Sequence, residues 1–70
     1  MVQSRSWQSR SKVLYRVTEA MDVLSMSRSV IYEEIRSGRL RSVKRGRNRF
    51  ISASAITDYV ALLEREARAA

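Results

Sequence analysis

The sequence predicts a single small domain that is mainly α-helical and contains one β-hairpin. Apolar residues recur at helical spacings in three segments, residues 19–24, 28–37 and 55–70. Between residues 40 and 51, two short apolar stretches flank a basic turn centred on a glycine, which is typical of a hairpin. A chain of 70 residues forms one domain, whose core rarely supplies more than about 3 to 5 kcal/mol.

The beginning of the chain differs in composition from the remainder. Residues 1–12 are rich in Ser and Arg and have no clear period, so we expect a flexible basic arm in front of a folded domain of residues 13–70. At the start of that domain, Val13, Tyr15 and Val17 alternate with other residues, which predicts a short extended segment.

The first helix is expected to begin after Thr18, whose hydroxyl can cap it. Glu19 follows in the first turn, where the helix dipole favours an acid. The residues expected to face inward are Ala20, Val23 and Leu24, and Met21 can join them.

The second helix is short and has clear boundaries. Ser27 can cap its beginning and Gly38 can end it in a left-handed conformation. Ile31 and Ile35, with Val30 beside them, have the spacing of one buried face. Because only about three residues link it to the first helix, the two helices must cross steeply, as in a helix-turn-helix.

A hairpin and a third helix complete the domain. Gly46 permits the hairpin turn, and Ser52 can cap the last helix. The apolar stripe of that helix is formed by Ile56, Tyr59 or Val60, Leu63 and Ala67. This helix is interpreted as scaffold, with contact of an exposed Leu62 with another protein as the alternative. Helix, tight turn, helix, two-stranded wing and helix make a winged helix-turn-helix.

The charge distribution indicates a polyanionic partner. The chain has fourteen Lys and Arg and seven Asp and Glu, which gives a formal net charge of +7. One segment carries seven of the basic residues and no acid: Arg36, Arg39, Arg41, Lys44, Arg45, Arg47 and Arg49. Such a segment repels itself unless a nucleic acid or an anionic membrane neutralises it. The alternative is a basic solvated loop that keeps the protein soluble.

Several other classes of protein fit the sequence poorly. The chain has no Cys and no His, so we expect no disulfide, no metal site, no cofactor and no enzymatic activity. It has no apolar run long enough to span a membrane and no signal peptide, so a soluble cytoplasmic protein is expected. A membrane-surface peptide would carry its basic residues on one long amphipathic helix, and an RNA-binding module would carry an aromatic platform.

Ordered motifs connect the chain to a known family. T-E-A at residues 18–20, V-I-Y at 30–32, S-G-x-L at 37–40 and the glycine-centred basic wing stand in the order found in the excisionase and MerR-type helix-turn-helix family. The sequence resembles this family from Val17 to Val60. It departs from the family pattern at Phe50, where an arginine is usual.

The resemblance implies that the second helix lies in the major groove of DNA. With Ile31 and Ile35 inward, the residues left for base and phosphate contacts are Arg28, Ser29, Tyr32, Glu33 and Arg36. Each of two residues has an alternative role. The ring of Tyr32 would be half buried between the helices, and Glu33 would form a surface pair with Arg36.

The wing is expected to enter the minor groove, where narrow A·T tracts strengthen the negative potential. The candidate contact residues are Lys44, Arg45, Arg47, Asn48 and Arg49, and Arg47 is the strongest of them. The alternative is that these arginines only neutralise phosphates, which would give affinity without sequence preference.

The resemblance also implies a role. Excisionases bind repeated sites in double-stranded DNA side by side, bend it, and direct a tyrosine-type integrase toward excision in a bacterial host. The expected partners are therefore duplex DNA, such an integrase and further copies of this chain. The alternative is a small MerR-like transcriptional regulator of the same fold.

Overall fold

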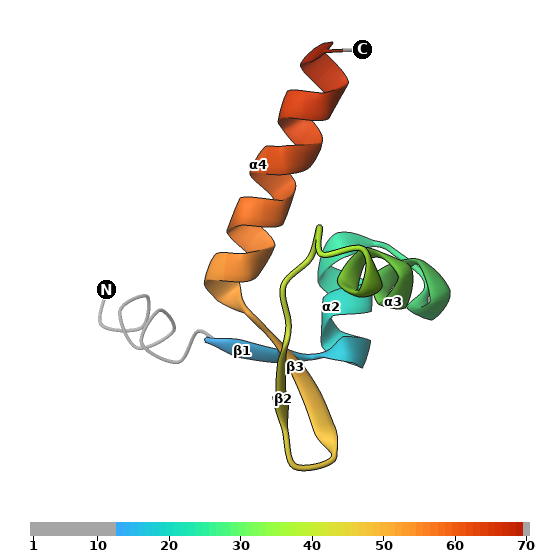
Figure 1. Cartoon of the computed structure of the whole chain (residues 1–70), viewed down its shortest axis with the longest axis vertical. Helices are drawn as coiled ribbons and strands as arrows, with labels where there is room; N and C mark the ends of the chain where they lie inside the picture. The colour runs from blue at the N-terminus through green and yellow to red at the C-terminus, as the bar shows by residue number, and fades with distance from the viewer. Residues whose placement is uncertain (1–12, 70) are drawn as a thin grey trace, which may run out of the picture.

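The computed structural model describes residues 13–69, and the expected basic arm of residues 1–12 lies outside them. The described elements are β1 (Leu14–Arg16), α2 (Val17–Leu24), α3 (Arg28–Arg36), β2 (Val43–Arg45), β3 (Asn48–Ser52) and α4 (Ala53–Ala69). In Figure 1, α4 rises from one end of β3, and the turn of the β2–β3 hairpin extends in the opposite direction. The predicted winged helix-turn-helix is confirmed.

Strand β1 adds a third strand to the two expected in the wing. The extended segment predicted near Tyr15 is present as β1, and it pairs antiparallel with β3, with Leu14 opposite Ser52 and Arg16 opposite Phe50. The strand order is therefore β1-β3-β2. Because β1 runs directly into α2, the sheet fixes the position at which the helix-turn-helix begins.

The predicted cap of the first helix is wrong. Arg16, and not Thr18, is the N-cap of α2. The Glu19 carboxylate accepts a hydrogen bond from the backbone N–H of Arg16 at 2.8 Å, which favours the earlier start. Because the helix begins at Val17, its buried residues are Val17 and Ala20, whereas Val23 is 53% exposed and does not face inward as predicted.

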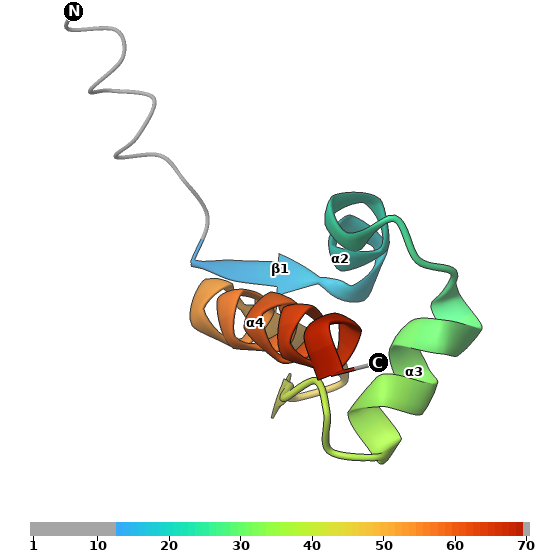
Figure 2. The ribbon, with the colours of Figure 1, turned by 90° about the horizontal axis from the view of Figure 1, so that it is seen from above.

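The capping residues of α3 are confirmed. The Ser27 hydroxyl accepts from the backbone N–H of Val30 at 3.3 Å, and Gly38 has the left-handed φ of +86° that ends the helix. In Figure 2, α2 is seen end-on whereas α3 lies across the view, which is the steep crossing expected from the short link. Ile31 is fully buried, but Val30 is 44% exposed and does not belong to the buried face.

Pairing in the wing extends almost to its tip. Val43 lies opposite Phe50, Lys44 opposite Arg49, and Arg45 opposite Asn48, so only two residues form the turn. Gly46 takes a φ of +61° there, and Arg47 follows it. The basic turn predicted between residues 40 and 51 is therefore shorter than expected, and of the wing cations only Arg47 lies in it. The others stand on strands, because the ladder continues to the residues that flank the turn.

Helix α4 begins at Ala53, two residues earlier than expected. The Ser52 hydroxyl accepts from the backbone N–H of Ala55 at 3.0 Å, which confirms the predicted cap. Of the two candidates for the stripe, Tyr59 is buried and Val60 is exposed. Leu63 packs against the core as expected, and Leu62 does so although it was expected to be exposed. Ala67, which was assigned to the apolar stripe, is exposed. None of the helices described in residues 13–69 is long and apolar enough to cross a bilayer.

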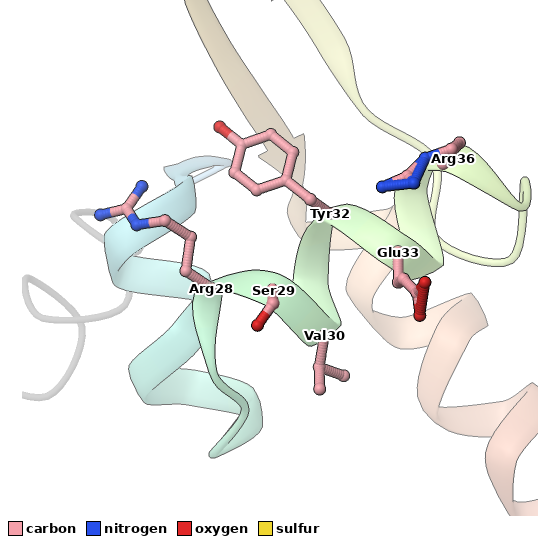
Figure 3. Close-up of a pocket in the computed structure, with 6 residues that line it drawn as sticks. All are labelled: Arg28, Ser29, Val30, Tyr32, Glu33 and Arg36. Atoms are coloured by element: carbon pink, nitrogen blue, oxygen red, sulfur yellow. The ribbon is translucent and has the colours of Figure 1, made fainter.

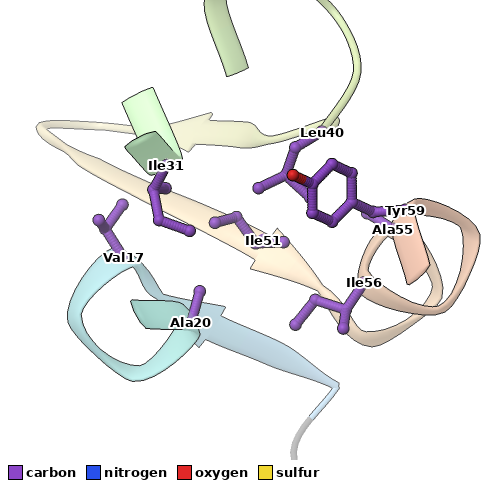
Figure 4. Close-up of a cluster of buried hydrophobic side chains, with 8 residues drawn as sticks. All are labelled: Val17, Ala20, Ile31, Leu40, Ile51, Ala55, Ile56 and Tyr59. Atoms are coloured by element: carbon purple, nitrogen blue, oxygen red, sulfur yellow. The ribbon is translucent and has the colours of Figure 1, made fainter. Parts of the chain in front are cut away.

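One apolar cluster joins every helix to the sheet. Figure 4 shows its members, which are Val17, Ala20, Ile31, Leu40, Ile51, Ala55, Ile56 and Tyr59. Ile51 on β3 and Leu40 in the loop after α3 are both fully buried. The cluster holds the inner side of α3 through Ile31 and leaves the outer side of that helix facing solvent.

Candidate nucleic-acid interface

The outer side of α3 forms a shallow hollow. Its lining residues, drawn in Figure 3, are Arg28, Ser29, Val30, Tyr32, Glu33 and Arg36. All six are exposed. The structure thus brings together the five residues predicted for this helix. Val30 also lines the hollow, although the sequence pattern had assigned it to the buried side.

A second hollow lies between the start of α2 and the wing. It is lined by Arg16, Val17, Thr18, Tyr32, Arg47, Asn48 and Arg49. Tyr32 lines both hollows, so the outer side of α3 and the wing form one continuous surface. Tyr32 is 37% exposed, so its ring is partly covered, as the half-buried alternative expected, while it also lines both hollows.

Sequence reasoning missed Arg16 and Thr18 as part of this surface. Both stand at the junction of β1 and α2, and their place beside the wing depends on the pairing of β1 with β3. The alternation of residues 13–17 predicted an extended segment but carried no information about its partner. Two predicted wing residues, Lys44 and Arg45, lie on β2 and do not line either hollow.

The wing concentrates positive charge. Lys44 and Arg49 are direct cross-strand neighbours, an arrangement that is unfavourable for like charges without an external anion. Arg49 donates a hydrogen bond to the Ser42 hydroxyl at 2.8 Å, which orients its guanidinium. Arg47 at the turn is exposed. A polyanion beside the wing would relieve this repulsion.

The profile of the helix-turn-helix domain family matches residues 14–61, from β1 into α4. The chain belongs to this family. It is therefore a DNA-binding domain, and the DNA expected from the family resemblance is a partner. Comparisons with curated proteins and with solved structures gave no significant match.

The seven basic residues between positions 36 and 49 of this helix-turn-helix domain divide into two groups. Arg39 pairs with Glu34 and Glu66, and Arg41 pairs with Asp58 at 2.6 Å, so these two arginines are engaged within the fold. The other five form no ion pair with a carboxylate of the described residues: Arg36, Lys44, Arg45, Arg47 and Arg49. Of these seven, the cations left without a carboxylate partner stand at the end of α3 and in the wing.

The two adjacent acids of α3 are used differently. Glu33 lies in the outer hollow and forms no ion pair with Arg36, so the predicted surface pair is absent from this described segment. Glu34 is turned inward, where its Oε1 accepts from Arg39 Nε and from the Tyr59 hydroxyl, both at 2.8 Å. Only one acid of the helix therefore lies on the candidate contact surface.

A polar network ties α4 to the end of α3. Arg39 Nε donates to Glu34 Oε1. The two terminal nitrogens of Arg39 donate to the two carboxylate oxygens of Glu66, and the distance from Nη2 to Oε1 is 2.8 Å. Hydrogen bonds from Arg39 and then Tyr59 lower the pKa of Glu34 below its ordinary value of 4.5. The hydrogen bond from Arg39 likewise lowers the pKa of Glu66. Burial, followed by the hydrogen bond to Glu34, raises the pKa of Tyr59 to about 12.

This network predicts a loss of stability in acid. A carboxyl group whose pKa is lowered by folding stabilises the domain above its unfolded pKa, and this contribution disappears as pH falls through the folded value. The free energy of unfolding should therefore decrease as pH falls below about 4.5. Glu34→Gln should cost about 1 kcal/mol or less at neutral pH, since the pair is partly exposed, and should flatten the acid limb.

Urea unfolding of both proteins between pH 3 and 7 measures this effect. Glu33→Gln is the matched control, because its carboxylate is exposed and forms no ion pair with another described residue. The control should retain the acid limb of the wild-type protein. If Glu34→Gln also retains it unchanged, Glu34 does not contribute to the acid sensitivity.

Proposed function

We propose that this protein is an architectural DNA-binding protein of the excisionase type. In this proposal it recognises a specific sequence, binds repeated sites cooperatively, bends the duplex, and directs a tyrosine-type integrase toward excision. One observation supports it most strongly. The outer side of α3 and the wing tip form a continuous exposed surface that meets at Tyr32, next to cations that no described carboxylate neutralises.

The two parts of this surface have different chemistry. The outer side of α3 offers side chains that match base edges, since Arg28 can donate to guanine and Glu33 can accept from the cytosine amine. The wing offers a narrow tip with Arg47 exposed at the turn, which suits insertion into a minor groove. Simultaneous engagement of a major and an adjacent minor groove would favour deformation of the duplex.

The size of the surface argues for several copies on one DNA molecule. Helix α3 has nine residues, and a single module of this kind contacts only a few base pairs. Useful discrimination among the many competing sites of a genome then requires adjacent binding sites. We therefore propose cooperative assembly of this chain along its target.

Footprinting of the purified protein on the attachment-region DNA of the element that encodes it tests the proposal. The expected result is a series of evenly spaced protected repeats that fill cooperatively, together with anomalous mobility of the bent complex. With the element's integrase added, excision should depend on this protein. Protection of a promoter site, with altered transcription and unchanged excision, would instead favour the small MerR-like regulator.

A further inference from the structure

Val30 is an apolar side chain in an otherwise polar hollow. It stands on α3 three residues after the Ser27 cap and is 44% exposed. In Figure 3 its side chain projects from the same side of α3 as those of Ser29 and Glu33, while Arg28 and Tyr32 project from the other side. The valine is therefore presented together with two groups capable of hydrogen bonding to bases.

The fold makes little use of this valine. The apolar side chains of the described residues that form or pack against the core do not include Val30. Valine is also less favourable in a helix than alanine, because its branched side chain loses rotamer freedom. Single exposed apolar residues are common on protein surfaces. This one differs in its location, since it lies in the candidate contact surface.

The major groove contains one apolar group on its base edges, the 5-methyl group of thymine. We infer that Val30 packs on the methyl group of a thymine and makes the protein prefer that base at one position of its site. The inference rests on the proposed placement of α3 in the major groove. It assigns a specificity-determining role to a residue that the sequence pattern had directed inward.

The helix also fixes where that thymine lies relative to other contacts. Residues three apart on a helix have Cβ atoms about 5 to 6 Å from each other, which applies to Val30 and Glu33. Successive bases of one strand rise about 3.4 Å along the duplex axis. The thymine should therefore lie within about two base pairs of the base whose identity is sensed by Glu33.

Replacing each thymine of the binding site by deoxyuridine, one at a time, tests the inference because it removes only the methyl group. For the full-length wild-type protein, one such replacement should weaken binding about fourfold, the effect of one buried methyl group. Val30→Ala should weaken binding to the unmodified site by a similar factor. The same deoxyuridine should then cost the variant almost nothing, since the methyl has lost its partner.

Val60→Ala is the matched control, because Val60 is an exposed valine on α4 and outside both hollows. It should retain the full penalty for the deoxyuridine. The inference is overturned if no thymine methyl matters to the wild-type protein, or if Val30→Ala remains equally sensitive to its removal. Equal binding of specific and scrambled duplexes would overturn the proposed function as well. A preference for the specific duplex that does not depend on any thymine methyl group would overturn only the inference about Val30.

Discussion

Replacing Ile31 with alanine is expected to unfold most of the domain at room temperature. Ile31 is fully buried, and it fastens α3 to the cluster that contains α2, β3 and α4. Truncation of a buried isoleucine to alanine costs about 2 to 5 kcal/mol, through lost burial and the cavity that remains. A core of this size supplies about 3 to 5 kcal/mol in total. The loss should be visible as a reduced helical circular dichroism signal and a lower urea midpoint.

The adjacent residue provides the control for this experiment. Val30→Ala changes a side chain on the same helix that is 44% exposed, so the free energy of unfolding should change by no more than about 0.5 kcal/mol. Comparable destabilisation by the two substitutions would contradict the orientation of α3 described above. The orientation matters because it decides which side of the helix is free to meet DNA.

Replacing Arg47 with alanine should weaken DNA binding severalfold without changing the fold. Arg47 is exposed at the turn of the wing and lines the hollow that the wing shares with α2 and α3. If about six phosphates are contacted, the logarithm of affinity should fall with the logarithm of salt concentration at a slope near −5. Loss of one contact with the DNA backbone reduces that slope by about 1. Gel-shift titration at several salt concentrations measures both quantities.

Arg68→Ala removes the same charge from the last turn of α4, outside both hollows. It should leave affinity and slope close to those of the wild-type protein. If the two variants lose affinity equally, net charge alone explains the effect. Measuring the affinity of Arg47→Ala on an A·T-rich and on a G·C-rich site separates minor-groove insertion from phosphate neutralisation. Insertion predicts a larger loss of affinity at the A·T-rich site.

The sequence predicted those features that depend on neighbouring residues. The caps at Ser27 and Ser52 and the helix end at Gly38 involve hydrogen bonds or backbone angles within three residues, so a local pattern suffices to find them. The residues on the outer side of α3 could also be predicted from a local pattern. Once Ile31 and Ile35 are directed inward, helical geometry decides which of their neighbours face outward.

The features that were missed depend on contacts between distant segments. The pairing of β1 with β3 joins residues more than thirty positions apart, and it brings Arg16 to the wing. Arg39 appeared in the sequence as part of the basic cluster. In the structure it is bound to Glu66, 27 residues away, and it lines neither hollow of the candidate interface. Composition and periodicity do not reveal which charges a fold neutralises internally.

In the proposed function, α3 and the wing contact one duplex at the same time. The chain has no cysteine, so Ser29→Cys and Asn48→Cys can each carry a single iron chelate that cleaves nearby DNA. We predict cleavage of one bound duplex from both positions, centred on the major groove for the first and on an adjacent minor groove about 5 base pairs away for the second. Cleavage from Ser29→Cys with none from Asn48→Cys, or coincident cleavage from both, would contradict the account.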